Sequence, residues 1–416
     1  MSQPPESQQG RAGALRILAH VLRDGRMMED RLSGLSGAPA ARALRLAGLT
    51  LRHMGRADAL LSPRLSRRPA PRVQDILRLA VVEIFEDGAA AHGVVNDAVT
   101  LARMSPRSTK QAGLVNAILR GLSDADAEWE ALPPSPLPGW LRKPLIKAWG
   151  DERVRAIEAV HLAGAPLDMT AKAGVAIPDA IALPTGSWRR SGGQVTALPG
   201  YDDGDWWVQD AAAAVPARLL GDVAGKRVLD LCAAPGGKTM QLAASGARVT
   251  ALDLSESRMK RVKANLARTG LTATLVTADA LDWTPDVPFD AVLLDAPCTA
   301  TGTIRRHPDL PHLRTARDVE ALTRLQYRLL DRALDMVTPG GPVVFCTCSL
   351  LPVEGEFQVT AALKRHPGLK ADPLDPAALG LPSEATSPHG LRLLPDLWAE
   401  RGGMDGFFMA RLRRSP

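Results

Sequence analysis

At 416 residues the chain is longer than one hydrophobic core normally organises, so two or three domains are expected. Its composition, 45% hydrophobic and 23% charged, is that of a globular protein with no membrane-spanning stretch, and the polar residues 1–10 lack a signal-peptide core, so we expect a cytoplasmic location. Residues 1–120 hold 18 Lys and Arg against 10 Asp and Glu, a net charge of +8, while the whole chain carries +6. This favours a polyanionic partner; an arginine-rich solvated surface is the alternative.

Apolar residues recur every three or four positions from about residue 12 to residue 121, which predicts several short amphipathic helices. Val73, Ile76, Leu77 and Ala80 form one such stripe. No strand-like alternation interrupts the pattern, so residues 1–125 are expected to form an all-α domain.

Residues 126–205 are expected to form a linker and a small α+β connecting subdomain. Residues 124–139 are acidic and then Pro-rich, which is typical of a linker, and a helical pattern follows at 140–162. Short strands are expected at Leu167–Lys172 and Gln194–Leu198.

Residues 206–416 alternate between strand-like and helix-like runs, beginning with a helix expected at Ala211–Leu220. This alternation predicts a doubly wound, mostly parallel, Rossmann-like sheet. Strands are expected at Arg227–Cys232, Arg248–Leu254, Thr272–Ala278, Asp290–Asp295 and Pro342–Cys348. Helices are expected at Lys238–Ala244, Ser257–Arg268, Ala316–Val337 and Glu354–His366. An antiparallel pair, Leu391–Pro395 and Gly406–Leu412, is expected at the end.

The first of these strands runs into a glycine-rich turn, Asp-Leu-Cys-Ala-Ala-Pro-Gly-Gly-Lys-Thr, at residues 230–239. Gly236 and Gly237 let the backbone bend and approach a ligand closely. The pattern is neither the dinucleotide fingerprint nor a phosphate loop. A turn between strand and helix can cradle the polar part of a cofactor, although a purely structural connection is the alternative.

Acidic or thiol side chains follow the other strands. The carboxyl ends of parallel strands meet at one edge of a sheet, so these groups are expected to face one pocket. Asp253 is placed to bind ribose hydroxyls and Asp279 an adenine amino group, while Asp295 and Cys298 share a motif. Cys298 and Cys348 are both candidate nucleophiles, and the residues alone do not choose between them.

The other two cysteines, Cys232 and Cys346, are expected to be small buried hydrophobes. No Cys-x-x-Cys pair or His spacing suggests zinc, so we expect free thiols and no metal.

Three motifs occur in a fixed order: the turn at 230–239, Asp-Ala-Pro-Cys-Thr at 295–299, and Thr-Cys-Ser at 347–349. Together they resemble the Nop/Sun family of S-adenosylmethionine-dependent RNA cytosine-5 methyltransferases, which residues 208–210 and 405–408 also match. The first 120 residues resemble an RNA-binding NusB domain, and the combination resembles the RsmB branch, which modifies small-subunit (16S) ribosomal RNA. The resemblance implies a class I methyltransferase domain with a seven-stranded, mostly parallel sheet.

The resemblance also implies a mechanism. Cys348 adds to C6 of the cytosine, Asp295 contacts N3 and the amino group, and C5 takes the methyl group. Cys298 assists elimination and product release. S-adenosylhomocysteine is the other product.

For the cofactor, the resemblance implies that the backbone of the turn holds the methionine part, with Lys238 near its carboxylate. Asp253 binds the ribose, Arg258 lies close by, Asp279 contacts the adenine, and Asp295 borders the same site. The turn residues assigned to this role are Cys232, Ala233, Ala234, Pro235, Gly236, Gly237 and Lys238.

RNA contacts are predicted at Arg305, Arg306 and His307, where a basic run could grip phosphate, with a solvated loop as the alternative. Lys172 is a further candidate, because Asp168-Met-Thr-Ala-Lys172 stands where the family has Leu-Arg-Val-Asn. Two smaller departures are Thr299-Ala300, where the family has Ser-Gly, and Gly355, where it has Asn.

Two rival functions are compatible with the residues. One is a non-catalytic RNA-binding or assembly factor, which the presence of Asp295, Cys298 and Cys348 disfavours. The other is a methyltransferase for transfer RNA or DNA. We expect RNA as the partner, with neither a membrane nor an obligate protein partner.

Overall fold

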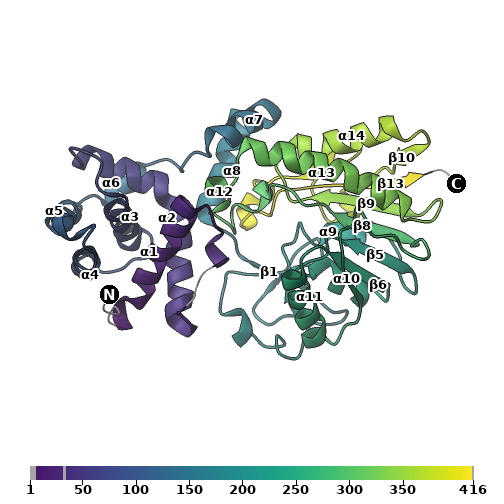
Figure 1. Ribbon diagram of the computed structural model, residues 1–416, viewed down its shortest axis with the longest axis horizontal. Helices are drawn as coiled ribbons and strands as arrows, with labels where there is room; N and C mark the ends of the chain where they lie inside the picture. The colour runs from purple at the N-terminus through teal and green to yellow at the C-terminus, as the bar shows by residue number, and fades with distance from the viewer. Residues whose placement is uncertain (1–5, 31–33, 415–416) are drawn as a thin grey trace. The chain divides into compact units, whose positions relative to one another are not determined.

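The computed structural model describes residues 6–30 and 34–414. The chain folds into two compact units, each with most of its residue contacts inside itself (Figure 1). The helical unit comprises Met1–Lys143, Asp151–Leu162 and Arg306–Arg314, and the sheet unit comprises Pro144–Gly150, Ala163–Arg305 and Thr315–Pro416. The expected connecting subdomain is thus shared between the two units. The three-part division of the chain stays a prediction.

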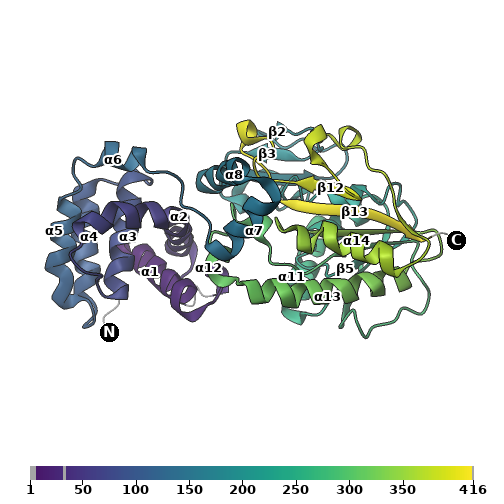
Figure 2. The ribbon, with the colours of Figure 1, turned by 90° about the horizontal axis from the view of Figure 1, so that it is seen from above.

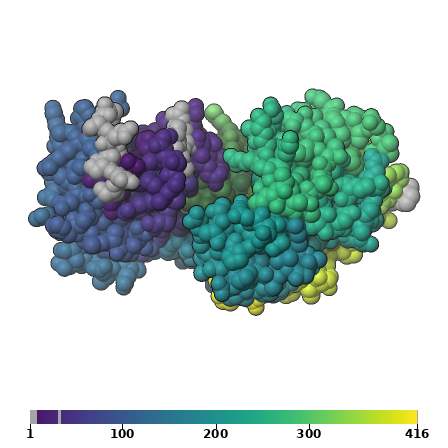
Figure 3. All heavy atoms as spheres, turned by 90° about the horizontal axis from the view of Figure 1, so that it is seen from below, coloured from purple at the N-terminus to yellow at the C-terminus, as the bar shows by residue number. Residues whose placement is uncertain are grey.

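The helical unit packs its helices around one apolar core (Figure 2). The stripe of Val73, Ile76, Leu77 and Ala80 is buried there, as its spacing predicts. Residues before 143, purple to blue, form much of this unit's surface (Figure 3). Its helices are α1 (Glu6–Asp24), α2 (Gly37–Leu61), α3 (Pro71–Phe85), α4 (Ala91–Arg103), α5 (Ala112–Arg120), α6 (Asp126–Ala131), most of α8 (Asp151–Ala163), the start of α7 (Gly139–Trp149) and the short α12 (Leu310–Leu313).

Ion pairs join these helices, and the pair between Arg11 and Glu83 is buried, whereas Asp97 and Glu86 are partly exposed. Arg11 of α1 contacts Glu83 of α3 at 2.8 Å and Asp97 of α4 at 2.7 Å. Arg56 of α2 contacts Glu86 at 2.7 Å. Removing one partner of a buried pair typically costs about 3–5 kcal/mol, so these arginines are part of the framework.

Residues 306–314 fold with the helices, although in sequence they follow a strand of the large sheet. The Met28 backbone N–H donates to Asp309 Oδ2 at 2.9 Å, and Trp140 Nε1 donates to the Pro311 carbonyl at 3.4 Å. The chain therefore leaves the sheet unit after Arg305 and returns to it at Thr315.

The sheet unit begins with a small antiparallel sheet in the order β2-β3-β1-β4. The strand expected at Leu167–Lys172 is confirmed, but the one expected at Gln194–Leu198 is wrong, because that segment contains a 3-10 turn. Gly192 and Gly193 precede it with φ of +149° and +127°, which interrupts an extended backbone. The strands are β1 (Leu167–Ala171), β2 (Ile181–Ala182), β3 (Trp188–Arg190) and β4 (Trp206–Val208).

The helix expected at Ala211–Leu220 is also largely wrong, since only α9 (Val215–Arg218) is helical. Asp210 Oδ1 accepts the Ala212 N–H at 2.9 Å, and Asp168 Oδ2 accepts the Ala211 N–H at 3.0 Å. These bonds hold the first residues in turns, because side-chain acceptors compete with helical hydrogen bonding.

The large sheet has nine strands in the described part of the chain, in the order β11-β12-β13-β9-β8-β5-β6-β7, with β10 paired to β13. Five are parallel: β5 (Arg227–Leu231), β6 (Arg248–Asp253), β7 (Thr274–Thr277), β8 (Ala291–Asp295) and β9 (Pro342–Thr347). The expected antiparallel pair is found as β12 (Gly390–Leu393) and β13 (Phe407–Arg414). Two short strands, β10 (Leu369–Ala371) and β11 (Thr386–Ser387), raise the count above the expected seven.

Helices cover both faces of this sheet (Figure 1). On one face α10 (Gly237–Ala244) and α11 (Glu256–Thr269) pack Met240 and Val262 against Ala251. On the other, α13 (Ala316–Asp335) and α14 (Glu356–Arg365) pack Leu330 and Val359 onto strand side chains. The doubly wound architecture is confirmed, and it leaves the carboxyl edge of the parallel strands for a site.

Candidate active site

The three motifs meet at the carboxyl edge because β5, β8 and β9 are adjacent parallel strands. Leu231 lies beside Leu294, and Asp295 lies beside Cys346. The Ala296 N–H donates to the Cys346 carbonyl at 2.9 Å, which carries the pairing one residue into the loop. Segments that are distant in sequence are thereby brought to one place.

Cys298 and Cys348 are brought together, with 3.4 Å between their sulfur atoms. Both are free thiols of intermediate exposure. The hydrogen bond to Cys348, burial and the nearby Glu354 carboxylate raise the pKa of Cys298 well above its usual value. Cys298 is therefore a neutral thiol near neutral pH.

Glu354, which sequence reasoning did not assign to the site, ties the two thiol loops together. Its carboxylate is 0% exposed and accepts the Thr299 N–H at 2.9 Å, the Ser349 hydroxyl at 2.6 Å and Gln326 Nε2 at 3.1 Å. Thr299 follows Cys298 and Ser349 follows Cys348. The only signal in the sequence was an acidic residue in the motif after Cys348.

Asp295 is held by Lys238, whose Nζ donates to Asp295 Oδ2 at 2.7 Å. Burial alone would lower the pKa of Lys238, but the Asp295 carboxylate and other negative neighbours outweigh burial and raise it. Cys346 is fully buried, and its sulfur lies 3.4 Å from Asp295 Oδ1. The expected contact between Lys238 and the cofactor carboxylate stays a prediction, because its ammonium here contacts Asp295.

The glycine-rich turn has the backbone that a cradle needs. Gly236, the N-cap of α10, has φ of +101°, and a Cβ there would lie 3.1 Å from Val262 Cγ1. Cys232, directly after β5, also has a positive φ, of +62°. Burial raises the pKa of the Cys232 thiol above its usual value, so this cysteine is unsuited to act as a thiolate.

The ribose-binding candidates surround this turn. Asp253 Oδ2 accepts the Ala234 N–H at 3.2 Å, and Oδ1 accepts the Ser255 N–H at 2.9 Å. Arg258 bonds the Ala234 carbonyl and lies 3.4 Å from Asp253. Each carboxylate oxygen retains a second lone pair, which a hydroxyl group can use.

The residues present fit S-adenosylmethionine. Asp230, beneath the turn, accepts a hydrogen bond from Thr239 Oγ1 at 2.6 Å, while its other oxygen has no partner among the described residues. Burial raises the pKa of Asp230 to about 7. Beyond Asp253, Leu254 is 71% exposed, an apolar surface for a flat base, and the neighbouring Asp279 is exposed as well. An orphaned acceptor for an ammonium group, a carboxylate for hydroxyls and an apolar surface match the parts of this cofactor.

The RNA contact predicted at Arg305 is wrong. Arg305 is 0% exposed and forms ion pairs with Asp405, at 2.9 Å, and with Asp210. A guanidinium enclosed by two carboxylates has no surface for a phosphate. Arg306 is exposed and His307 is half-buried, and both belong to the helical unit.

Lys172 is half-buried just after β1. The RNA contacts of Lys172, Arg306 and His307 stay predictions.

Comparison with known proteins decides between the families that such a site permits. A profile of the 16S rRNA methyltransferases RsmB/F matches residues 217–413, and a NusB family profile matches residues 8–124. The chain is 36% identical over 396 residues to ribosomal RNA small subunit methyltransferase B of Pseudomonas putida, covering 87% of this chain and 88% of that protein. The protein of that name from Xanthomonas campestris is 36% identical over 409 residues, 88% of this chain and 90% of that one. The chain belongs to the RsmB/F methyltransferase family.

Membership of the RsmB/F family makes the protein an S-adenosylmethionine-dependent RNA methyltransferase. A solved methyltransferase homologue from Pyrococcus horikoshii matches 66% of this chain and 94% of its own, with 29% identity and a TM-score of 0.55. Across the described residues, no helix is long and apolar enough to cross a membrane, and no cluster of three or more metal-ligating side chains occurs.

Proposed function

We propose that the protein methylates C5 of a cytosine in small-subunit ribosomal RNA through a covalent bond between Cys348 and C6. The pair of thiols 3.4 Å apart, beside the Lys238–Asp295 pair, carries this proposal. The relatives named ribosomal RNA small subunit methyltransferase B support the RNA class. We place the reaction in the cytoplasm, where ribosomal RNA is assembled.

The chemistry follows from the weak nucleophilicity of C5. Addition of the Cys348 thiolate to C6 moves electron density to C5, and Asp295, oriented by Lys238, contacts N3 and the amino group. When bound, S-adenosylmethionine supplies an electrophilic methyl group. After C5 is methylated, a base takes the C5 proton, the C–H electrons restore the C5–C6 double bond, and the C6–S bond breaks to release Cys348.

The structure supplies a physical reason to give the thiols different roles. Two thiolates 3.4 Å apart would repel one another, so the first ionisation opposes the second. The Glu354 carboxylate adds negative charge beside Cys298 and favours its protonated form. Cys298 is therefore the thiol that donates its proton to the departing Cys348 sulfur during elimination, and Cys348 is the nucleophile.

The test compares single variants on ribosomal RNA from cells that lack the protein. Cys348→Ala is expected to lose activity by a factor on the order of 10⁴ or more, because the covalent path is removed. Cys298→Ala is expected to accumulate a protein–RNA adduct that survives denaturing electrophoresis.

Bisulfite sequencing then locates the base. Full activity in Cys348→Ala would refute the assignment of the nucleophile. If the methylation of small-subunit cytosines is the same in the deletion strain and the parent strain, the proposed substrate is refuted.

A further inference from the structure

The arginines of the helical unit fall into two groups. One group is held in ion pairs between helices, as Arg11 and Arg56 are. The other has no ion pair with a carboxylate in the described residues, and two of its members, Arg72 and Arg107, line one cleft. The excess charge of the first 120 residues is thus available at this cleft.

Three separate segments build the cleft, which has a volume of about 680 Å³. Arg23 comes from the end of α1, Arg72 from the start of α3, and Arg107 from the loop between α4 and α5. Apolar side chains, among them Leu15 and Pro71, line the remainder. The cleft therefore combines cationic groups with an apolar surface.

One carboxylate, Asp75, lines the cleft and cannot balance this charge. It contacts Arg23 at 2.7 Å and Arg78 at 3.6 Å. Asp75 is 2% exposed, and burial raises the pKa of its carboxyl despite these contacts.

Arg72 Nε is buried and has no hydrogen-bond partner among residues 6–30 and 34–414. Burial and repulsion by Arg23 lower the pKa of Arg72, partly offset by Asp75. An anion in the cleft would relieve this repulsion.

We propose that this cleft binds a backbone phosphate of the RNA substrate, with the attached nucleoside against the apolar side chains. The proposal rests on the proposed function, which makes RNA the substrate. Guanidinium groups bind phosphate in a planar, often bidentate way. Exposed cations next to the lining residues in sequence, Arg67, Arg68, Arg103 and Lys110, extend the positive surface along the chain.

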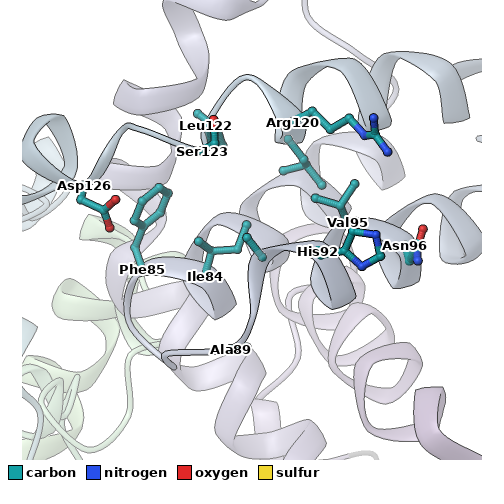
Figure 4. Close-up of a pocket in the computed structure, with 12 residues that line it drawn as sticks. Ile84, Phe85, Ala89, His92, Val95, Asn96, Arg120, Leu122, Ser123 and Asp126 are labelled. Carbon is teal, nitrogen blue, oxygen red and sulfur yellow. The ribbon is translucent and has the colours of Figure 1, made fainter.

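A second cleft in the same unit provides a contrast (Figure 4). It has a volume of about 650 Å³ and is lined by apolar residues such as Ile84 and Val95. Its charged residues are Arg120 and Asp126, which balance each other. This second cleft lacks the excess positive charge that the first offers to a phosphate, and Arg120 is a matched control.

The test uses the full-length protein with Arg72→Gln and Arg107→Gln combined. The RNA KM and Kd are expected to rise roughly tenfold at unchanged kcat. The slope of log Kd against log salt is expected to fall by about 0.7, the value for one phosphate of a single strand that is no longer neutralised. Arg120→Gln, which removes a charge elsewhere, should leave the slope unchanged. Lysine at both positions should restore the slope but only part of the affinity, because an ammonium group cannot bind phosphate in a bidentate way.

Arg107→Glu, in an exposed loop, keeps the test decisive if the double variant unfolds, because it should weaken RNA binding without changing the melting temperature. Unchanged KM and salt slope in folded variants would overturn the cleft proposal, while wild-type methylation of ribosomal RNA would still stand. Absence of wild-type methylation would instead overturn the proposed function.

Discussion

Cys298 and Cys348 carry the same functional group yet sit in different electrostatic surroundings. The hydrogen bond to Cys348 and burial raise the pKa of Cys298 most, and the carboxylate of Glu354, which organises both loops, raises it further. A carboxylate acts strongly on its neighbours at short range in a water-poor site. Glu354 is therefore a positioning residue that also biases the protonation of a neighbour.

Glu354→Gln should lower kcat by about 10- to 100-fold. The amide group of the new glutamine would point N–H bonds at groups that now donate to the Glu354 carboxylate, so both loops and the two thiols that they carry would shift. Loss of the negative charge should also lower the pKa of Cys298. Alkylation of Cys298, followed by mass spectrometry across pH, should then begin at lower pH than in the wild type.

Glu384→Gln is a suitable comparison for this experiment, because Glu384 is exposed and bonds its neighbour Ser383 rather than a thiol loop. An alkylation profile of Cys298 that is the same in Glu354→Gln and the wild type would contradict the electrostatic role.

At the scale of elements, the loops after β8 and β9 and the start of β13 fit against one another at glycines. The Gly302 N–H donates to the Cys348 carbonyl at 2.9 Å, and the Gly406 N–H donates to the Gly302 carbonyl at 2.8 Å. A Cβ on Gly302 would lie 1.9 Å from the Gly406 carbonyl oxygen. The atoms that a Cβ on Gly302 would meet belong to the backbone of Gly406 and Cys348, so no flexible side chain can move aside to make room.

Gly302→Ala should therefore destabilise the sheet unit by about 1–3 kcal/mol and reduce kcat through displacement of Cys298. Thermal unfolding and single-turnover methylation measure the two effects. Gly113→Ala, in α5 with nothing within 4 Å of the new Cβ, is the control and should be neutral or stabilising. Equal behaviour of the two variants would contradict the packing argument.

Much of the large sheet and the meeting of its motifs could be predicted from sequence, because each apolar run ends in a reactive or acidic residue. Asp253, Asp295 and the thiols all lie at the predicted edge. Glu354 and the Lys238–Asp295 pair could not be predicted, because such contacts join positions roughly 55 residues apart and nothing local encodes them. The helix expected at Ala211–Leu220 failed because distant side chains, such as Asp168, capture its backbone donors.

At the scale of the whole molecule, buried ion pairs join parts of the sheet unit that lie far apart in sequence. Arg305 forms ion pairs with Asp210, two residues after β4, and with Asp405, two residues before β13. Its neighbour Arg306 belongs to the helical unit. A basic run in sequence thus divides between a buried structural role and an exposed position, which composition alone cannot foresee.

Arg305→Met should cost about 3–5 kcal/mol, because it leaves two buried carboxylates unpaired. The melting temperature of the sheet unit should fall by roughly 6–20 °C, as calorimetry can measure. RNA affinity per folded molecule should not change, whereas a residue that grips phosphate would weaken it when replaced. Arg324→Met, at an exposed position on α13, provides the comparison and should leave the melting temperature nearly unchanged.

Asp230, at the start of the glycine-rich turn, should make the stability of the fold depend on pH. Its folded pKa of about 7 lies above the ordinary value of 3.8, so folding takes up a proton between those pH values. The stabilisation from the neutral carboxyl is complete below about pH 4 and is lost as pH rises through about 7. We predict that a cofactor whose ammonium group approaches Asp230 releases this proton on binding and binds more tightly as pH rises across the same interval, which calorimetry in buffers of different ionisation enthalpy can measure. As pH rises toward 7, ionisation of Asp230 should therefore lower the stability of the fold while it raises the affinity for the cofactor.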